Sequence, residues 1–132
     1  MQVSNSLGTT AAFPVVKGAF APAFFSFTSM YAAGVHISGG DVGPAGLITG
    51  GNFSPAKTGE TIELFGTGFG PTDPQSLAGT ILAAPAPLAN AVTVTVGGLP
   101  AQVLFAGLTS NGLVQLNVAS TASRARVARC NG

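Results

Sequence analysis

The chain has little charge, one cysteine, no tryptophan and no long apolar run. Charged residues make up 7% of its 132 residues, against roughly a quarter in an average soluble domain. Its formal net charge of +1 produces too weak a field to attract nucleic acid or an acidic membrane. No stretch approaches the roughly 18 apolar residues that a spanning helix needs. We therefore expect no nucleic-acid partner and no membrane span.

The single cysteine, Cys130, cannot form a disulfide within the chain. The first 16 residues lack the basic start and continuous apolar segment of a secretory signal. If the domain is exported, we expect its export signal to lie outside this sequence.

Hydrophobic residues, glycine and proline are abundant instead. A hydrophobic share of 46% is ample for a core. The 19 glycines and 9 prolines place a turn or breaker every few residues. This composition favours short strands over long helices and predicts an all-β domain.

Alternation with a period of two dominates the second half of the chain. Residues 91–97 (AVTVTVG) place valines on one face and threonines on the other, as in a strand with one buried face. Three more segments follow this period: residues 61–65, 101–106 and 114–118. Gly97-Gly98 and Asn111-Gly112 are turn pairs between them. These strands predict an antiparallel core over residues 54–118.

The first fifty residues are less regular. Four short strands are predicted there: residues 13–16, 23–27, 31–37 and 45–49. We expect Phe20, Phe24, Phe25 and Phe27 to supply core material. Gly39-Gly40-Asp41 predicts a hairpin turn. Residues 71–88 contain four prolines and predict a long crossover with at most one helical turn.

Two segments together resemble a known family. Residues 55–74 (PAKTGETIELFGTGFGPTDP) and 92–118 (VTVTVGGLPAQVLFAGLTSNGLVQLNV) resemble the Solibacter-type uncharacterised C-terminal domain of large exported acidobacterial proteins. The opening, VSNSLGTTAAFPV followed by APAFF, looks like the end of a preceding immunoglobulin-like unit, so the resemblance covers residues 3–118. The core segment is also similar to the wider IPT/TIG group, in which Pro-x-x-Gly, Gly-x-Gly-Phe-Gly and Val-x-Val-Gly-Gly recur.

The resemblance implies an immunoglobulin-like (IPT/TIG-like) antiparallel β-sandwich in a secreted or cell-surface protein. Residues 1–24 would be the end of a preceding unit and its junction, and residues 25–118 the module. Residues 119–132 (ASTASRARVARCNG) depart from the family, which continues into further closing strands. We expect a disordered tail there, a truncated or frame-shifted end, and a last strand that is missing or replaced. A sheet edge would then be exposed to pairing with another chain.

The family has no established activity, so it supplies no catalytic residues. Gly66-Thr67-Gly68-Phe69-Gly70 superficially resembles a nucleotide loop, but Pro71 follows it and neither a lysine nor a helical pattern is near. We interpret it as a turn where strands cross closely. His36, the only histidine, lies on the opposite face of its strand from Val35 and Ile37. We expect it to be a structural or surface residue.

The four acids are Asp41, Glu60, Glu63 and Asp73. Glu60 and Glu63 differ by three positions on a strand, so they cannot form a glycosidase pair locally. Asp41 and Asp73 lie in turns, where Asp commonly caps its own backbone. A weak calcium site of loop carbonyls with one Asp stays open as an alternative.

The remaining candidates lie mostly at the end of the chain. Cys130 is expected to be an inert thiol, because no base is near it in sequence. Three arginines without interleaved aromatic residues make a small footprint for nucleic acid: Arg124, Arg126 and Arg129. Asn52-Phe53-Ser54 fits a glycosylation sequon.

These observations predict a non-catalytic structural or adhesive module of an exported bacterial protein, with neighbouring domains as partners. No catalytic, cofactor-binding or metal-binding residue is expected, and no cofactor. The alternative is a carbohydrate-binding accessory domain, for which Tyr31 is the only aromatic residue besides phenylalanine. A third hypothesis, an enzyme in its own right, has no sequence pattern in its favour.

Overall fold

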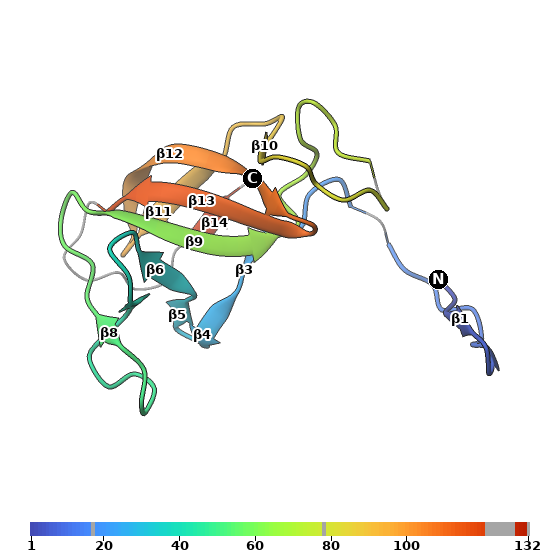
Figure 1. Ribbon diagram of the computed structural model, residues 1–132, viewed down its shortest axis with the longest axis horizontal. Coiled ribbons are helices and arrows are strands. Elements are labelled where there is room, and N and C mark those ends of the chain that lie inside the picture. Colours follow the sequence, from blue (N-terminus) through green and yellow to red (C-terminus); the bar gives the residue numbers. More distant parts are fainter. Residues whose placement is uncertain (17, 78, 121–128, 132) are drawn as a thin grey trace.

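The computed structural model describes residues 1–16, 18–77, 79–120 and 129–131, the last three by their backbone alone. The described part is all-β and contains no helix that could cross a bilayer. Its strands, most of which are labelled in Figure 1, are β1 (Ser4–Asn5), β2 (Gly8–Thr9), β3 (Ala23–Phe24), β4 (Ser26–Thr28), β5 (Tyr31–Ala32), β6 (Gly34–His36), β7 (Asp41–Val42), β8 (Phe53–Ser54), β9 (Thr61–Thr67), β10 (Ala86–Pro87), β11 (Thr93–Val96), β12 (Leu99–Ser110), β13 (Leu113–Ala119) and β14 (Arg129–Asn131).

One mixed sheet folds over itself to form two layers. Its order is β14-β11-β12-β13-β9-β6-β7-β8, and every pair is antiparallel except β7–β8. β12 belongs to both layers, because its first residues pair with β11 and the remainder pairs with β13. Bulges within β12 at Val103/Phe105 and Leu108/Ser110 increase its local bend. The arrangement is consistent with a β-sandwich, and β13 and β9 lie in front of β11 and β14 in Figure 1.

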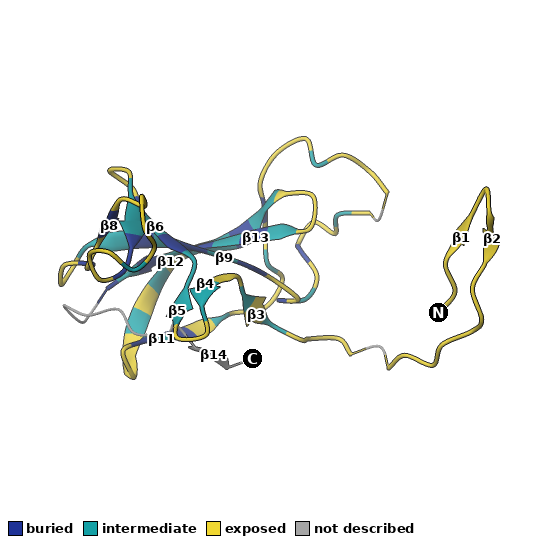
Figure 2. Cartoon of the chain, turned by 90° about the horizontal axis from the view of Figure 1, so that it is seen from below, coloured by how far each residue is buried: buried dark blue, intermediate teal, exposed yellow. Residues whose placement is uncertain are grey.

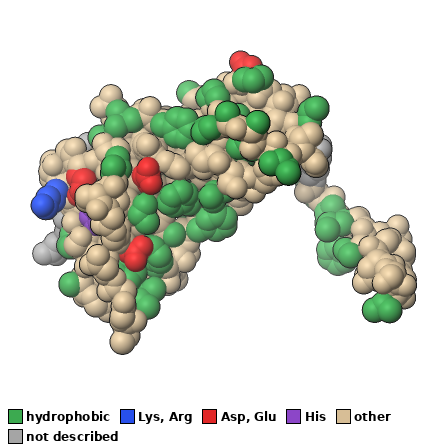
Figure 3. All heavy atoms as spheres, viewed as in Figure 1, with side chains coloured by type: hydrophobic (Ala, Val, Ile, Leu, Met, Phe, Trp, Pro, Cys, Tyr) green, Lys and Arg blue, Asp and Glu red, His purple; other side chains and the backbone are tan. Residues whose placement is uncertain are grey.

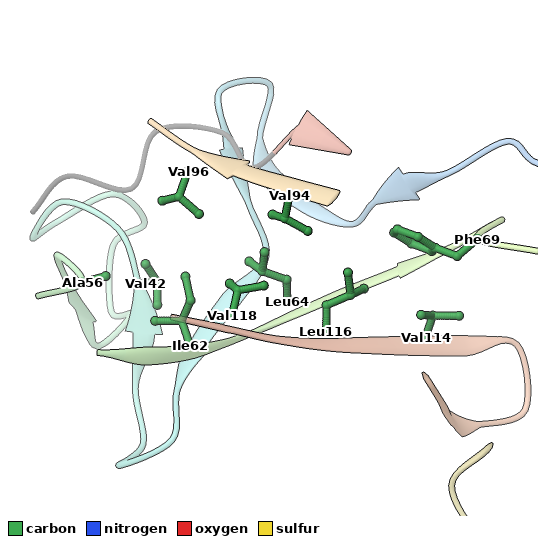
Figure 4. Packing of buried hydrophobic residues seen from close by; sticks show 10 residues of the cluster. All are labelled: Val42, Ala56, Ile62, Leu64, Phe69, Val94, Val96, Val114, Leu116 and Val118. Atoms are coloured by element: carbon green, nitrogen blue, oxygen red, sulfur yellow. The ribbon is translucent and has the colours of Figure 1, made fainter. Parts of the chain in front are cut away.

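The core lies between these layers. The side chains of Val94 and Val96 on β11 point toward the opposite layer in Figure 4. That layer contributes alternate residues of β9 and β13, because successive side chains of a strand point to opposite faces. The buried cluster consists of Val42, Ala56, Ile62, Leu64, Phe69, Val94, Val96, Val114, Leu116 and Val118.

The period-two predictions for the second half of the chain are confirmed. All four predicted strands are present, and β12 extends well beyond residues 101–106 in both directions. The valines of β11 face inward as predicted. Gly97, Gly98 and Gly112 have positive φ values of 62°, 86° and 75°, as their turns require. Residues 71–88 form a crossover with β10 and a bridge between Thr72 and Leu88, and no helical turn among the described residues.

The first fifty residues correct several predictions. Residues 13–16 form no strand, and their side chains are exposed. Phe24 and Phe27 are half-buried, whereas Phe20 and Phe25 are exposed and lie outside the core. The hairpin at Gly39-Gly40 is confirmed, but β7 supplies its returning strand, because residues 45–49 form turns.

An N-terminal arm precedes the sandwich. β1 and β2 form a two-stranded hairpin that projects away from the body in Figures 1 and 2. All its residues are exposed, as the yellow ribbon in Figure 2 shows. The chain joins the sandwich at β3, which pairs with the end of β9.

The glycines of residues 66–70 permit this junction. A Cβ atom on Gly66 would collide with the Ala23 carbonyl, and one on Gly68 with the Ala21 carbonyl. Gly68 also has a φ of 78°. Two chain segments therefore approach closely at these glycines, as interpreted from the sequence, but Gly66 and Thr67 continue β9 and do not form the expected turn.

The C-terminal segment contributes backbone pairing. Residues 129–131 form β14, which pairs with β11 at the end of the sheet. The edge of β11 is therefore covered by a strand, although the sequence predicted that the last strand is missing or replaced. Residues 121–128, with Arg124 and Arg126, lie outside the described residues, as does the prediction of disorder for them.

Candidate functional site

The most concentrated chemistry of the described residues lies around His36. Its strand alternates so that Val35 faces outward and His36 inward, where only 6% of the residue is exposed. His36 Nδ1 lies 2.7 Å from Glu60 Oε1. His36 Nε2 lies 3.0 Å from the carbonyl oxygen of Ser54 and 3.0 Å from its Oγ. The structure thus brings His36 together with Ser54 and Glu60, which lie 18 and 24 positions after it along the chain.

Local backbone geometry positions each partner of His36. Ser54 ends β8, whose parallel pairing with β7 places it opposite Val42. Glu60 ends a tight turn in which its own N–H donates to the Lys57 carbonyl, and the Lys57 N–H donates to Glu60 Oε2 at 2.8 Å. The Ser120 N–H donates to the Glu60 carbonyl at 2.8 Å, which joins this turn to the end of β13.

A serine, a histidine and a carboxylate in contact resemble a nucleophile, its base and the orienting acid. For that chemistry, Nε2 must be unprotonated and accept the proton of the serine hydroxyl. Here Nε2 also faces the Ser54 carbonyl, which can only accept a hydrogen bond. Nδ1 faces a carboxylate, which is also an acceptor when ionised. When Nε2 donates to the Ser54 carbonyl, it cannot also accept the proton of the serine hydroxyl, so the two Ser54 oxygens compete for this nitrogen.

The arrangement instead fits a structural clamp. His36 joins β6 to β8 through the Ser54 carbonyl, which also accepts the Gly43 N–H at 3.0 Å. Its other nitrogen joins β6 to the turn before β9 through Glu60. We call His36, Ser54 and Glu60 the histidine clamp. The expectation of a structural role for His36 agrees with this geometry.

The Glu60 carboxylate is stabilised in its ionised form. The hydrogen bond from the Lys57 backbone lowers the pKa of Glu60 below its ordinary value of 4.5, and the contact with His36 and the nearby Lys57 charge lower that pKa further. Partial burial opposes these effects but does not reverse them.

Stability should therefore depend on pH through Glu60. The pKa of Glu60 is lower in the folded chain than in the unfolded chain. The contribution of Glu60 to the free energy of unfolding is therefore complete above pH 4.5 and is lost as the pH falls through the folded pKa. We expect Glu60→Gln to lower the free energy of unfolding by about 1 kcal/mol at pH 7. The difference from the unsubstituted chain should shrink below pH 4.5 in urea titrations. Glu63→Gln is the matched control, and an equal pH profile for both variants would contradict the assignment.

The other predicted candidates do not converge. Asp41 lies in β7 and Asp73 in the crossover, each with its N–H bonded to a backbone carbonyl. Glu63 lies on the opposite face of β9 from the core. Glu60 lies in the turn before β9 and not on the strand as predicted, because β9 begins at Thr61. Cys130 and Arg129 are described only by their backbone in β14. Among the described residues, no group of three His, Cys, Asp or Glu side chains could hold a metal ion.

A second set of polar side chains lies on the outer face of the sheet. Gln115 Nε2 donates to Glu63 Oε1 at 3.0 Å and to Asn117 Oδ1 at 2.8 Å. Asn117 lies opposite Glu63 in the β13–β9 register, so all three side chains share one face. Each is half-buried, with its backbone held by sheet pairing on both sides. We call these three residues the polar row.

Phenylalanines lie on both sides of the polar row. Phe65 lies opposite Gln115 on β9, and Phe105 lies opposite Asn117 on β12. A Cβ on Gly107 would lie 2.6 Å from Phe105 Cζ, so the ring leans over this glycine. Figure 3 shows hydrophobic side chains spread over this side of the molecule.

A hollow of about 520 Å³ lies elsewhere, between the loop of residues 75–83 and the β12–β13 turn. Asn111, in the β12–β13 turn, holds the loop of residues 75–83 by two hydrogen bonds. Its Oδ1 accepts the Leu82 N–H at 2.8 Å, and its Nδ2 donates to the Thr80 carbonyl at 3.0 Å. None of its described lining residues is ionisable, so the hollow has no acid or base for catalysis.

No protein-family model, no curated protein and no solved structure matches this chain. The motif resemblance to the Solibacter-type domain and to the IPT/TIG group therefore remains a hypothesis.

Sequence reasoning missed Ser54 and the polar row. Ser54 is prominent in the sequence only as the end of a sequon, and its approach to His36 depends on the β7–β8 pairing. The polar row had a usable signal, since Glu63, Gln115 and Asn117 all occupy outward positions of predicted strands. Their neighbourhood depends on the register between β9 and β13.

Proposed function

We propose that this chain is a non-catalytic, immunoglobulin-like structural or adhesive module of a secreted or cell-surface bacterial protein. The observation that carries the proposal is the histidine clamp. Both nitrogens of the single histidine contact acceptors that hold β6, β8 and the turn before β9 together. A catalytic base would need Nε2 to accept the proton of the Ser54 hydroxyl, and the Ser54 carbonyl competes with the hydroxyl for that nitrogen.

The fold and the motifs support the same proposal. Two packed β-layers provide a rigid frame, in which Gly97-Gly98 turn from β11 into β12 and the glycines of residues 66–70 lie at the end of β9. The resemblance of these motifs to the IPT/TIG group supports the proposal. Residues 1–24 would connect the module to a preceding unit. The apolar side chains exposed along this arm suit a contact with such a neighbour: Met1, Val3, Leu7, Phe13, Val15, Val16 and Phe20.

Turnover assays test the non-catalytic proposal. We expect the chain to hydrolyse p-nitrophenyl acetate, a peptide library and neutral polysaccharides no faster than Ser54→Ala does. The reason is that an imidazole that donates from Nε2 to the Ser54 carbonyl cannot also accept the proton of the Ser54 hydroxyl. Hydrolysis that disappears in both Ser54→Ala and His36→Gln, with folding intact by circular dichroism, would overturn the proposal.

Carbohydrate binding is the second candidate function. The observation in its favour is the polar row flanked by Phe65 and Phe105 on the solvent side of the sheet. Tyr31, the aromatic residue considered from the sequence, is half-buried in β5 and lies outside this row.

A further inference from the structure

The polar row has hydrogen-bonding capacity left after its internal contacts. Gln115 uses its amide nitrogen to join Glu63 Oε1 and Asn117 Oδ1. Within the described part of the chain, Glu63 Oε2, Gln115 Oε1 and Asn117 Nδ2 have no protein partner. This leaves two acceptors and one donor group in a fixed arrangement. A hydroxylated ligand matches this set, because each hydroxyl both donates and accepts.

The phenylalanines add flat apolar surface beside these groups. Phe105 leans over Gly107, whose position opposite Gln115 brings the ring toward the polar row. Phe65 is on the other side of Gln115, and Phe25, 48% exposed, donates its N–H to the Phe65 carbonyl. Aromatic rings bind apolar faces through a large contact area at a small cost in conformational entropy. Sugar rings combine such apolar C–H faces with hydroxyl groups at their edges.

The charge of this face selects against other ligands. Glu63 is the one charged residue of β9, β12 and β13, and Asp41 on β7 shares the same face two strands away. Lys57, in the turn before β9, is the one Lys or Arg side chain that the structure describes. In Figure 3 the colour of Lys and Arg shows at one end of the molecule. An anionic polymer would be repelled by Glu63 and would find no lysine or arginine among the described side chains of this face. A protein covering the face would remove the Glu63 carboxylate from water, and no described side chain of this face offers a countercharge.

We propose that this outer face of β9, β12 and β13 binds a neutral polysaccharide. Phe65 and Phe105 stack against its sugar rings, and the polar row hydrogen-bonds to its hydroxyl groups. The proposal rests on the proposed function, a non-catalytic module, and names the ligand class of its adhesive surface.

Affinity electrophoresis of the 132-residue chain tests the site, with hydroxyethylcellulose, xylan and galactomannan as neutral probes and polygalacturonate as the anionic probe. We expect at least one neutral probe to retard the chain and polygalacturonate to leave it unaffected. Phe105→Ala and Asn117→Ala should each weaken retardation roughly tenfold, given the energy of one aromatic or hydrogen-bond contact. Ile81→Ala is the matched control, because Ile81 is 89% exposed in the loop of residues 75–83, and it should bind normally.

Three results would overturn the proposal. The first is that no neutral probe retards the chain. The second is that retardation persists in both Phe105→Ala and Asn117→Ala, or disappears only in Tyr31→Ala. The third is that the chain sediments as a dimer that Phe105→Ala dissociates. Gln115→Ala replaces Phe105→Ala if that variant fails to fold by circular dichroism. Loss of the ligand proposal would leave the non-catalytic function standing, since that function depends on the absence of Ser54-dependent turnover.

Discussion

Replacing Leu116 by alanine is expected to lower the free energy of unfolding by about 3 kcal/mol. Leu116 has an exposed fraction of 0% and lies on β13, paired with Leu64 on β9 and Ala106 on β12. Its side chain faces the space between the two layers (Figure 4). Truncation removes apolar contact and leaves a cavity that a sheet paired on both sides cannot close.

Urea denaturation followed by far-UV circular dichroism measures this loss. Leu99→Ala is the matched control, because Leu99 starts β12 with 52% of its surface exposed. That variant should stay within about 0.5 kcal/mol of the unsubstituted chain. Equal losses in the two variants would mean that β11 does not pack over β13.

The second large effect is expected at the histidine clamp. His36→Phe keeps a ring of similar shape but removes the contact of Nδ1 with the Glu60 carboxylate and the contact of Nε2 with Ser54. We expect a loss of about 2 kcal/mol in the free energy of unfolding at pH 7. The loss stays below that of a fully buried pair, because 24% of the Glu60 side chain is exposed and the Lys57 N–H still holds it.

Two comparisons separate a clamp from an activated serine. Ser54→Ala retains the carbonyl that His36 contacts, so it should cost within about 0.5 kcal/mol. In a double-mutant cycle, His36→Phe with Glu60→Gln should cost less than the sum of the single variants, since both remove one shared contact. A Ser54→Ala loss as large as that of His36→Phe would contradict the clamp and assign the main contact to the hydroxyl.

The polar row can be predicted from the sequence further than the histidine clamp can. Outward positions for Glu63, Gln115 and Asn117 follow directly from the period of two in their strands. Their contact needs β13 to lie beside β9 with Asn117 opposite Glu63, and a shift of one residue would turn these side chains into the core. Sequence periodicity predicts each strand, but it does not predict which strands pair or in which register.

In the first fifty residues, the sequence also did not predict which phenylalanines are buried. Phe20 and Phe25 are as apolar as the core valines, yet their side chains are exposed. The hydrophobicity of a residue does not by itself show whether the fold places another layer against it. Tertiary packing provides such a layer for Phe24, whose ring lies 5.5 Å from that of Phe69.

By itself, the sequence determined the all-β class, the four central strands and their turns, and the inward faces of β9, β11 and β13. These features depend on local alternation and on glycines that adopt positive φ, which neighbouring residues dictate. Only the tertiary structure decided that Ser54, His36 and Glu60 meet, that the polar row lies between two phenylalanines, and that β14 covers the edge beside β11. The physical reason is that these contacts join segments far apart in the chain, so their existence depends on register and layer packing and not on any local pattern.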